Sequence, residues 1–235
     1  MKLSREELKG LMKNKLMKAG LNEKHADIAA EVMTWSDERG YHSHGAVRVE
    51  YYSERIAKGG ITANPNFTFK ETGPCSGMFD GDNGCGYAAA KEAMDIAIEM
   101  AKKNGIAVIG ISNISHSGSI GYYTEMAAKN DLAAISFCQS DPMAVPPGGT
   151  EPYYGTNPIS FAAPTADDRT VVFDMATTVQ AWGKILDKRS RGESIPDNWA
   201  VDEKGNPVTD PNKVNALLPI AGAKGYGLMM MVDIF

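Results

Sequence analysis

An apolar run from Ile106 to Ile111 is followed by a loop of serines and glycines, and helical periodicity resumes near Ile120. A short apolar run between polar segments is typical of a buried strand. The chain is therefore expected to fold around a sheet whose strands alternate with helices. In open sheets of this kind, ligands usually bind at the loops that follow the carboxyl ends of the strands.

The loop after this strand carries a single imidazole, His116, between Ser115 and Ser117. Histidine suits acid and base chemistry because its ordinary pKa lies near neutral pH. A histidine between hydroxyl residues is also commonly a structural residue of its loop. This stretch alone does not distinguish the two interpretations.

Composition narrows the class of protein. The 235 residues carry a formal net charge of -5, which provides no basic field to concentrate nucleic acid or anionic lipid. The first residues lack the apolar segment of a signal peptide, and no run approaches the roughly 20 apolar residues that span a bilayer. We expect a cytoplasmic protein without nucleic-acid or membrane partners. Three widely spaced cysteines, Cys75, Cys85 and Cys138, predict reduced thiols.

The first sixty residues predict three helices. Ser4 and Glu7 have the spacing of a capping box. Asn22 is a suitable cap for a second helix, and a third is expected from Ala46 to Lys58. The apolar stripes of these helices need a partner surface elsewhere in the chain. We assign residues 1–62 to a helical N-terminal subdomain.

Strands and helices alternate over residues 63–235, which we assign to a mixed α/β domain, so the fold class is α/β or α+β. The strand at 106–111, a helix at 120–129 and a strand at 132–137 are expected to form one βαβ unit. The last predicted helix, 224–235, ends on apolar residues, and we therefore expect that the domain is truncated at its C-terminal end. The other expected strands are 67–71, 76–80, 159–162 and 171–173, and the other expected helices are 88–103, closed by Gly105, and 180–188.

His44, Arg48 and Tyr52 are spaced four residues apart, so a helix that begins near His44 places them on one face. The planar fork of an arginine can hold a carboxylate, and this face therefore suits a small organic acid. The alternative is a solvated helix face with a surface Arg–Glu pair, which contributes little. His42 and His44 also permit a metal site, but no zinc-binding pattern accompanies them, and we expect none.

Asp141 follows the strand predicted at 132–137, much as His116 follows its own strand. A carboxylate in such a loop can orient an imidazole. Before Pro142 it can equally begin an ordinary turn, and the sequence leaves both interpretations open.

A dinucleotide-binding pattern, Gly84-x-Gly86-x-x-Ala89, lies between a predicted strand and a predicted helix. The strand that follows, at 106–111, lacks the acidic residue that would bind a ribose hydroxyl. We therefore disfavour a Rossmann fold and interpret these glycines as permitting a tight entry into the helix.

Five motifs together resemble the malate/L-lactate/L-sulfolactate dehydrogenase family, in the order in which that family carries them. Two further motifs, at 138–143 and 180–184, narrow the resemblance to one subfamily. The five motifs are residues 42–45 with Arg48, 115–118, 154–158, 174–177 and 224–227.

The resemblance implies a nicotinamide-dependent oxidation of a 2-hydroxy acid on a fold that is L-sulfolactate dehydrogenase-like and not Rossmann-like. It implies that residues 63–235 bind the cofactor, NAD or NADP, and that the protein is a homodimer. His116 matches the family's catalytic base, with Asp141 as its candidate orienting group. The resemblance places the substrate at Ser43, His44, Arg48 and Tyr52, and the cofactor at Ser140, Asp174, Met175, Ala176 and Lys224.

Two alternatives remain open at this point. The first is another dehydrogenase or reductase of the same family that acts on malate, lactate, sulfolactate or a cyclic imino acid. The second is an inactive fragment that binds a partner chain through exposed apolar surface.

Overall fold

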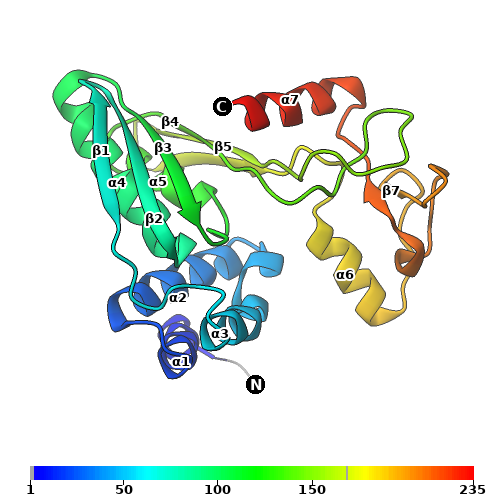
Figure 1. The fold of residues 1–235 in the computed structure, drawn as a ribbon, viewed down its shortest axis with the longest axis horizontal. Coiled ribbons are helices and arrows are strands. Elements are labelled where there is room, and N and C mark those ends of the chain that lie inside the picture. Colours follow the sequence, from blue (N-terminus) through cyan, green and yellow to red (C-terminus); the bar gives the residue numbers. More distant parts are fainter. Residues whose placement is uncertain (1–2, 168) are drawn as a thin grey trace. The chain divides into compact units, whose positions relative to one another are not determined.

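A computed structural model describes residues 3–167 and 169–235 (Figure 1). The chain forms two compact units. The first comprises Met1–Ala134 and Ala162–Val172, and the second comprises Ile135–Phe161 and Phe173–Phe235. The predicted boundary after residue 62 lies inside the first unit.

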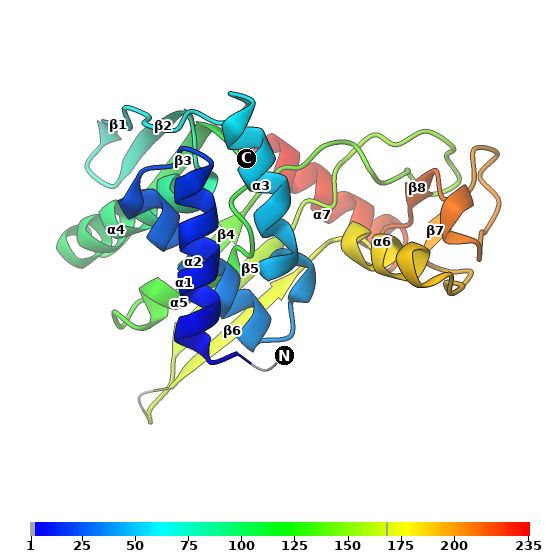
Figure 2. The same ribbon diagram turned by 90° about the horizontal axis from the view of Figure 1, so that it is seen from below.

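Two N-terminal helices begin where their caps predict. The Ser4 hydroxyl accepts a hydrogen bond from the Glu7 amide at 3.3 Å, and the Glu7 carboxylate accepts one from the Ser4 amide at 2.8 Å. The Asn22 side chain accepts the His25 amide at 2.9 Å. Figures 1 and 2 show these helices beside the third. Their bounds are α1, Arg5–Lys18, α2, Glu23–Glu38, and α3, Val49–Ala57.

Helix α2 supplies the surface that joins the N-terminal helices to the rest of the first unit. Its buried face includes Ala26, Ala29, Ala30 and Met33. These mostly small side chains let α2 pack against α1 and also against α4, Gly86–Asn104. The partner surface that the apolar stripes require is therefore provided by the α/β part of the same unit.

The prediction of one helix from Ala46 to Lys58 is wrong at its start. Two 3-10 turns, His42–His44 and Ala46–Arg48, precede α3. Gly45 lies between them with φ -90° and ψ -147°, which is not a helical conformation. A Cβ on Gly45 would overlap the Asp37 carboxylate, which accepts the Ala46 amide at 2.8 Å. The non-helical conformation of Gly45 therefore separates His44 from the helical segment, and the Asp37 carboxylate binds the amide at the start of that segment.

The sheet of the first unit contains three strands in the order β1-β2-β3. Strands β1 and β2 are antiparallel, and β2 and β3 are parallel with α4 as the connecting helix. One face of the sheet packs on α4 around Phe79, Ala89 and Ala93. The bounds are β1, Thr68–Gly73, β2, Ser76–Gly84, and β3, Val108–Ile114.

The prediction that the strands at 106–111 and 132–137 belong to one βαβ unit is also wrong. Strand β4 lies in a second sheet, β4-β5-β6, and β3 pairs with β2. The helix after β3 packs against α2 and α4, so it does not carry the chain across the face of the first sheet. The bounds are α5, Gly121–Ala128, β4, Ala134–Phe137, β5, Ile159–Pro164, and β6, Thr170–Met175.

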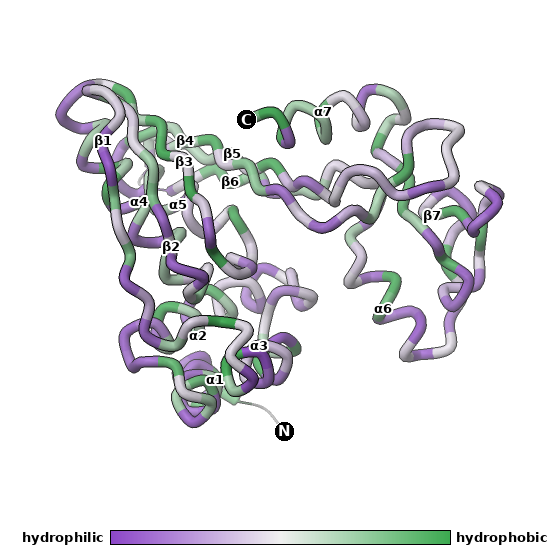
Figure 3. The backbone as a smooth tube through the Cα atoms, in the orientation of Figure 1, coloured by the Kyte–Doolittle hydropathy of each residue, from purple (hydrophilic) through white to green (hydrophobic). Residues whose placement is uncertain are grey.

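The second unit has its own small core around Ile185, Ile195 and Leu217. Asp202 begins the predicted turn, and its carboxylate accepts the amides of Lys204 and Asn206 at 2.9 Å. The last helix is largely apolar, as Figure 3 shows. The bounds are α6, Trp182–Arg191, β7, Ala200–Val201, β8, Ala216–Leu217, and α7, Ala223–Ile234.

None of the helices within residues 3–167 and 169–235 combines the length and the apolar character that a bilayer crossing requires. The three cysteines carry free thiols.

The loop after β3 crosses the start of α4 at Gly86. The Gly86 amide donates to the Ser115 hydroxyl at 2.9 Å. A Cβ on Gly86 would overlap the Ser115 carbonyl oxygen and lie 2.7 Å from that of His116. The glycine is therefore required for a close approach between a helix and a loop, a role different from the tight helix entry that the sequence suggested.

Gly86→Ala is expected to lower the free energy of unfolding by about 1–3 kcal/mol, because the added methyl group displaces the loop backbone. Denaturant unfolding of the purified chain measures the change. Gly10→Ala is the matched control, since a Cβ on Gly10 in α1 meets nothing within 4 Å and alanine raises helix stability by up to about 1 kcal/mol. Equal stability of the two variants would contradict the packing role of Gly86.

Candidate active site

His116 lies at the carboxyl end of β3, where the sequence places it, in a loop that is fixed on both sides. The Ser115 amide donates to the Gly84 carbonyl at 3.1 Å, and the Ser115 hydroxyl accepts the Gly86 amide. On the other side, the Tyr123 hydroxyl donates to the Ser117 carbonyl at 2.5 Å. The backbone around His116 is therefore held by buried hydrogen bonds, while its side chain remains exposed.

Two residues of the predicted stripe contact the His116 ring. The Tyr52 hydroxyl oxygen lies 2.5 Å from Nδ1 of His116. The His44 ring stacks on His116 with centroids 5.6 Å apart and an interplanar angle of 22°. The Gly118 amide also donates to Nδ1, at 3.2 Å. The ring is thus held at Nδ1 and along one face, which leaves Nε2 available to a ligand.

Arg48 completes this group of residues. Its Nε donates to the Ser43 carbonyl at 2.7 Å, and the Ser43 hydroxyl lies 2.9 Å from Nδ1 of His44. Among the residues that the structure describes, Arg48 has no acidic partner, because the neighbouring Glu50 pairs with Lys15 at 2.9 Å. The surface Arg–Glu pair that we considered from the sequence is therefore not formed, and the guanidinium can receive a carboxylate.

The two imidazoles are neutral at neutral pH. Burial, with a contribution from Arg48, lowers the pKa of His44 to about 4. Burial, His44 and Arg48 together lower the pKa of His116 to about 3, although water at its exposed edge offsets part of this effect. Burial raises the pKa of Tyr52 to about 12. The group therefore presents one guanidinium charge among neutral groups, which suits an anionic substrate.

His42 and His44 point to different partners. Nδ1 of His42 lies 2.9 Å from the Asp37 carboxylate, whereas His44 faces Ser43 and His116. Within the described parts of the chain, no group of three or more His, Cys, Asp or Glu side chains gathers in a way that could hold a metal ion.

The predicted cofactor residues all belong to the second unit. The Ser140 hydroxyl accepts the Thr156 amide at 2.9 Å, and the Thr177 amide, just after residues 174–176, donates to the Thr156 carbonyl at 2.9 Å. Lys224 is exposed in the first turn of α7. The loop with Ser140 and the end of β6 are therefore connected through Thr156.

Asn157 ties the same loops to α7. Its side-chain NH₂ donates to the Met229 carbonyl at 2.9 Å and to the Asp233 carboxylate at 2.7 Å, and its oxygen accepts the Ser140 amide at 3.3 Å. The residue is fully buried with φ 32°. Sequence reasoning placed Asn157 in a family motif but gave it no role. The sequence shows only an asparagine before a proline, and this pattern does not indicate a buried side chain that bonds to two other segments.

Asp141 is exposed and belongs to the second unit. Nδ1 of His116 is already engaged by Tyr52 and Gly118 of the first unit. The role of Asp141 as an orienting group stays a prediction.

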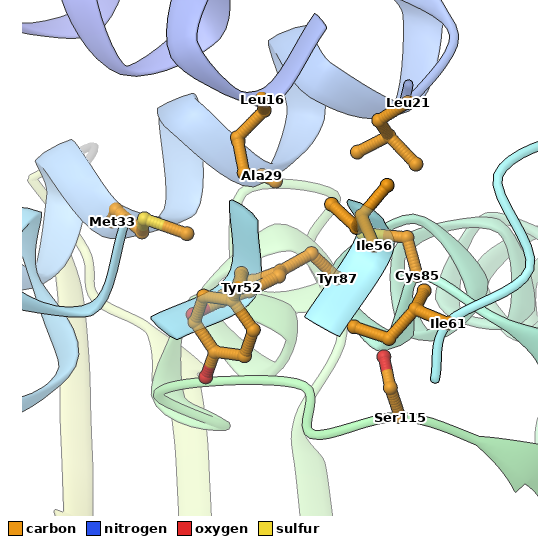
Figure 4. A pocket seen from close by; sticks show the side chains of 10 residues that line it. All are labelled: Leu16, Leu21, Ala29, Met33, Tyr52, Ile56, Ile61, Cys85, Tyr87 and Ser115. Carbon is orange, nitrogen blue, oxygen red and sulfur yellow. The ribbon is translucent and has the colours of Figure 1, made fainter. Parts of the chain in front are cut away.

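Tyr87 is the residue of this region that the sequence did not indicate. Its hydroxyl is buried and makes no hydrogen bond of normal length within the described chain, although it interacts with the Tyr52 hydroxyl and lowers the pKa of that phenol. The Tyr87 ring meets Tyr52 edge to face, with centroids 5.3 Å apart. Both line a cavity of about 10 Å³ together with Leu16, Met33, Ile56 and Ser115 (Figure 4). A cavity this small and this apolar is a poor site for an ordered water molecule.

Comparison with known protein sequences identifies dehydrogenases as the relatives of this chain. Residues 3–235 match the family model for malate/L-lactate dehydrogenase. Ureidoglycolate dehydrogenase (NAD(+)) of Escherichia coli strain K12 is 60% identical over 234 residues, with 100% of this chain and 67% of that protein covered. Malate dehydrogenase of Pyrococcus abyssi is 39% identical over 243 residues, with 99% of this chain and 67% of that protein covered.

Solved structures of dehydrogenases also resemble this chain in fold. Malate dehydrogenase from Entamoeba histolytica superposes with a TM-score of 0.94 at 28% identity, covering 100% of this chain and 69% of that chain. Sulfolactate dehydrogenase from Methanocaldococcus jannaschii superposes with a TM-score of 0.90 at 37% identity, covering 100% of this chain and 68% of that chain.

In a titration followed by NMR, the ring signals of His44 and His116 are expected to move below pH 6.5, because burial and the charge of Arg48 lower both pKa values. Because the folded protein does not protonate these rings while the unfolded chain does, each ring lowers stability as pH falls below 6.5. His44→Asn should raise the pKa of His116, since His44 contributes to its depression. His25, whose pKa burial lowers at a separate place, is the internal control. A His116 titration near pH 6.5 in the unmodified chain would contradict this electrostatic description.

Tyr87→Phe is expected to leave the free energy of unfolding unchanged or to raise it by up to about 1 kcal/mol, because the hydroxyl it removes is buried without a hydrogen bond. Tyr123→Phe is the matched control. That variant removes a buried hydroxyl bonded to the Ser117 carbonyl and should cost about 1–2 kcal/mol. Thermal unfolding of both variants measures the difference, and a larger loss for Tyr87→Phe would show that its hydroxyl is satisfied.

Proposed function

Because the chain belongs to the malate/L-lactate dehydrogenase family, we propose that it is an NAD-dependent dehydrogenase that oxidises ureidoglycolate to oxalurate in purine degradation. The family predicted from the motifs, and the mixed α/β fold that accompanies it, are both confirmed. The subfamily suggested by the motifs at 138–143 and 180–184 is the one whose members are 60% identical to this chain.

One observation carries this proposal. A neutral imidazole, His116, is held at Nδ1 beside an arginine without an acidic partner in the described chain. A 2-hydroxy acid needs both groups, a base for its hydroxyl proton and a cation for its carboxylate. The first unit brings them together with Ser43, His44 and Tyr52, which we propose as the walls of the substrate site.

In the proposed reaction, Arg48 binds the substrate carboxylate and so orients the hydroxyl-bearing carbon. Nε2 of His116 takes the hydroxyl proton as the O–H bond breaks, and the carbon loses its hydrogen with both electrons. NAD, when bound, supplies the nicotinamide ring that accepts this hydride. The products are a 2-oxo acid, NADH and a protonated His116, which returns its proton to water.

The residues of the second unit fit a dinucleotide better than the start of α4 does. In Rossmann proteins the amides at such a helix start bind the pyrophosphate, but here the Gly86 amide is bonded to the Ser115 hydroxyl. Lys224 and the half-buried Ser140 offer an ammonium and a hydroxyl instead. We propose that they bind NAD with Asp174, Met175 and Ala176, and NADP is the alternative that a cofactor assay separates.

A second candidate is another substrate of the same family. Relatives 33–39% identical to this chain are a malate dehydrogenase, a malate/(S)-sulfolactate dehydrogenase and a cyclic imino acid reductase. Arg48 can bind the carboxylate of each of these acids, so activity assays with a panel of substrates are needed to distinguish the candidate substrates. The homodimer, the cytoplasmic location and the non-catalytic fragment stay predictions.

His116→Ala is expected to lower kcat with ureidoglycolate and NAD about 100-fold or more, because it removes the base. Arg48→Lys should raise KM and lower kcat together, since an ammonium cannot hold a carboxylate through two parallel bonds. The rate of NADH formation measures both. Arg55→Lys is the control, because Arg55 is exposed on α3 and bonds to Tyr51.

Wild-type turnover in His116→Ala would refute the assignment of the base. Oxidation of malate or sulfolactate without oxidation of ureidoglycolate would overturn the proposed substrate and keep the family chemistry.

A further inference from the structure

Nδ1 of His116 has two neighbours with different hydrogen-bonding abilities. The Gly118 amide, at 3.2 Å, can only donate, whereas the Tyr52 hydroxyl, at 2.5 Å, can donate or accept. A bond from Gly118 requires a lone pair on Nδ1. The neutral ring in this arrangement therefore carries its proton on Nε2, and the Tyr52 hydroxyl also donates to Nδ1.

The proposed reaction needs the other tautomer. Nε2 can take the hydroxyl proton only when its lone pair is free, so the ring proton must then lie on Nδ1. The group that faces Nδ1 must accept a hydrogen bond in that state. Of the two neighbours, only the Tyr52 hydroxyl can do so, by rotation about its C–O bond. The change of tautomer exchanges one proton with water and leaves the ring neutral.

When Tyr52 accepts from Nδ1, its own O–H needs a new acceptor. The hydroxyl of Tyr87 is buried, lacks a hydrogen bond within the described chain and belongs to the ring that packs edge to face on Tyr52. Figure 4 shows the two phenols among the side chains that line the same small cavity, together with Ser115. Burial raises the pKa of both phenols, while the interaction between the two hydroxyls lowers the pKa of Tyr52 and raises that of Tyr87. This is the direction expected when Tyr87 donates toward Tyr52 at rest, so the two hydroxyls must reverse this direction when Tyr52 turns. The Tyr87 hydroxyl is thus the neighbouring group that can accept a hydrogen bond from Tyr52 when the Tyr52 hydroxyl turns.

We propose that Tyr52 is a positioning residue that bonds to Nδ1 of His116 in both tautomers. It donates at rest and accepts during catalysis, when its O–H turns to donate a hydrogen bond to Tyr87. This inference rests on the proposed function and refines it. The Tyr52 ring still lines the proposed substrate site, while the geometry assigns its hydroxyl to Nδ1 of His116.

Ring nitrogen-15 NMR of the chain without substrate tests the resting state. The His116 signals, identified by their loss in His116→Ala, should show a bare Nδ1 and a protonated Nε2 in the unmodified chain. Tyr52→Phe should shift the Nδ1 signal downfield while Nε2 stays protonated, because Nδ1 loses the bond from the hydroxyl and keeps only the bond from the Gly118 amide. Tyr51→Phe is the matched control, because Tyr51 is the adjacent phenol and its hydroxyl is bonded to Arg55. Identical spectra for Tyr52→Phe and the unmodified chain would overturn the proposal.

Steady-state kinetics test the catalytic state. Tyr52→Phe should lower kcat about tenfold or more with KM changed less than about twofold, and Tyr87→Phe should lower kcat by a smaller factor while leaving the resting spectrum unchanged. A higher KM with unchanged kcat in Tyr52→Phe would show that the hydroxyl acts only in substrate binding and would overturn its role at Nδ1. Unchanged kcat in Tyr87→Phe would refute the role of Tyr87 as the hydrogen-bond acceptor for Tyr52. If the unmodified chain does not oxidise ureidoglycolate, the proposed function fails, and the NMR comparison still decides the role of Tyr52.

Discussion

The position of His116 depends on one close approach, the crossing of the loop after β3 over the first turn of α4. Gly86 makes this possible, because any side chain there would overlap the Ser115 carbonyl. The β2–α4–β3 connection fixes the helix, and the Ser115 hydroxyl and the Ser117 carbonyl fix the loop. A sequence pattern that resembles a phosphate-binding turn therefore serves here to hold a side chain in place.

The charge of the site depends on which groups the nearby carboxylates of Asp37 and Glu50 bind. Asp37 binds the Ala46 amide and faces His42, and Glu50 pairs with Lys15. These contacts leave Arg48 without an acidic partner in the described chain, and its charge helps to keep His44 and His116 neutral. The Asp37 carboxylate is thus occupied by the Ala46 amide and His42 and does not pair with Arg48.

Local signals in the sequence predicted local structure well. The Ser4 capping box, the Asn22 cap and Gly105 at the end of α4, with φ 86°, each act within a few residues, so the sequence displays them fully. The motifs predicted the family, although most residue roles within it stay predictions. Pairing of β3 with β2, and the broken helix before Val49, depend on contacts between distant residues. Tyr87 was missed for the same reason, since burial of a hydroxyl without a partner is a property of the packed chain.

A tyrosine at Nδ1 of His116 has a different effect from the carboxylate that commonly orients a catalytic imidazole. A carboxylate only accepts, so it would hold the proton on Nδ1 and raise the pKa of the ring. It would also place a second negative charge close to the substrate carboxylate and to Arg48. Tyr52, with a pKa raised to about 12 by burial, stays neutral, so Arg48 remains available to the substrate and His116 remains a neutral base. The choice of a phenol is therefore consistent with a site that must bind an anion and remove a proton from it.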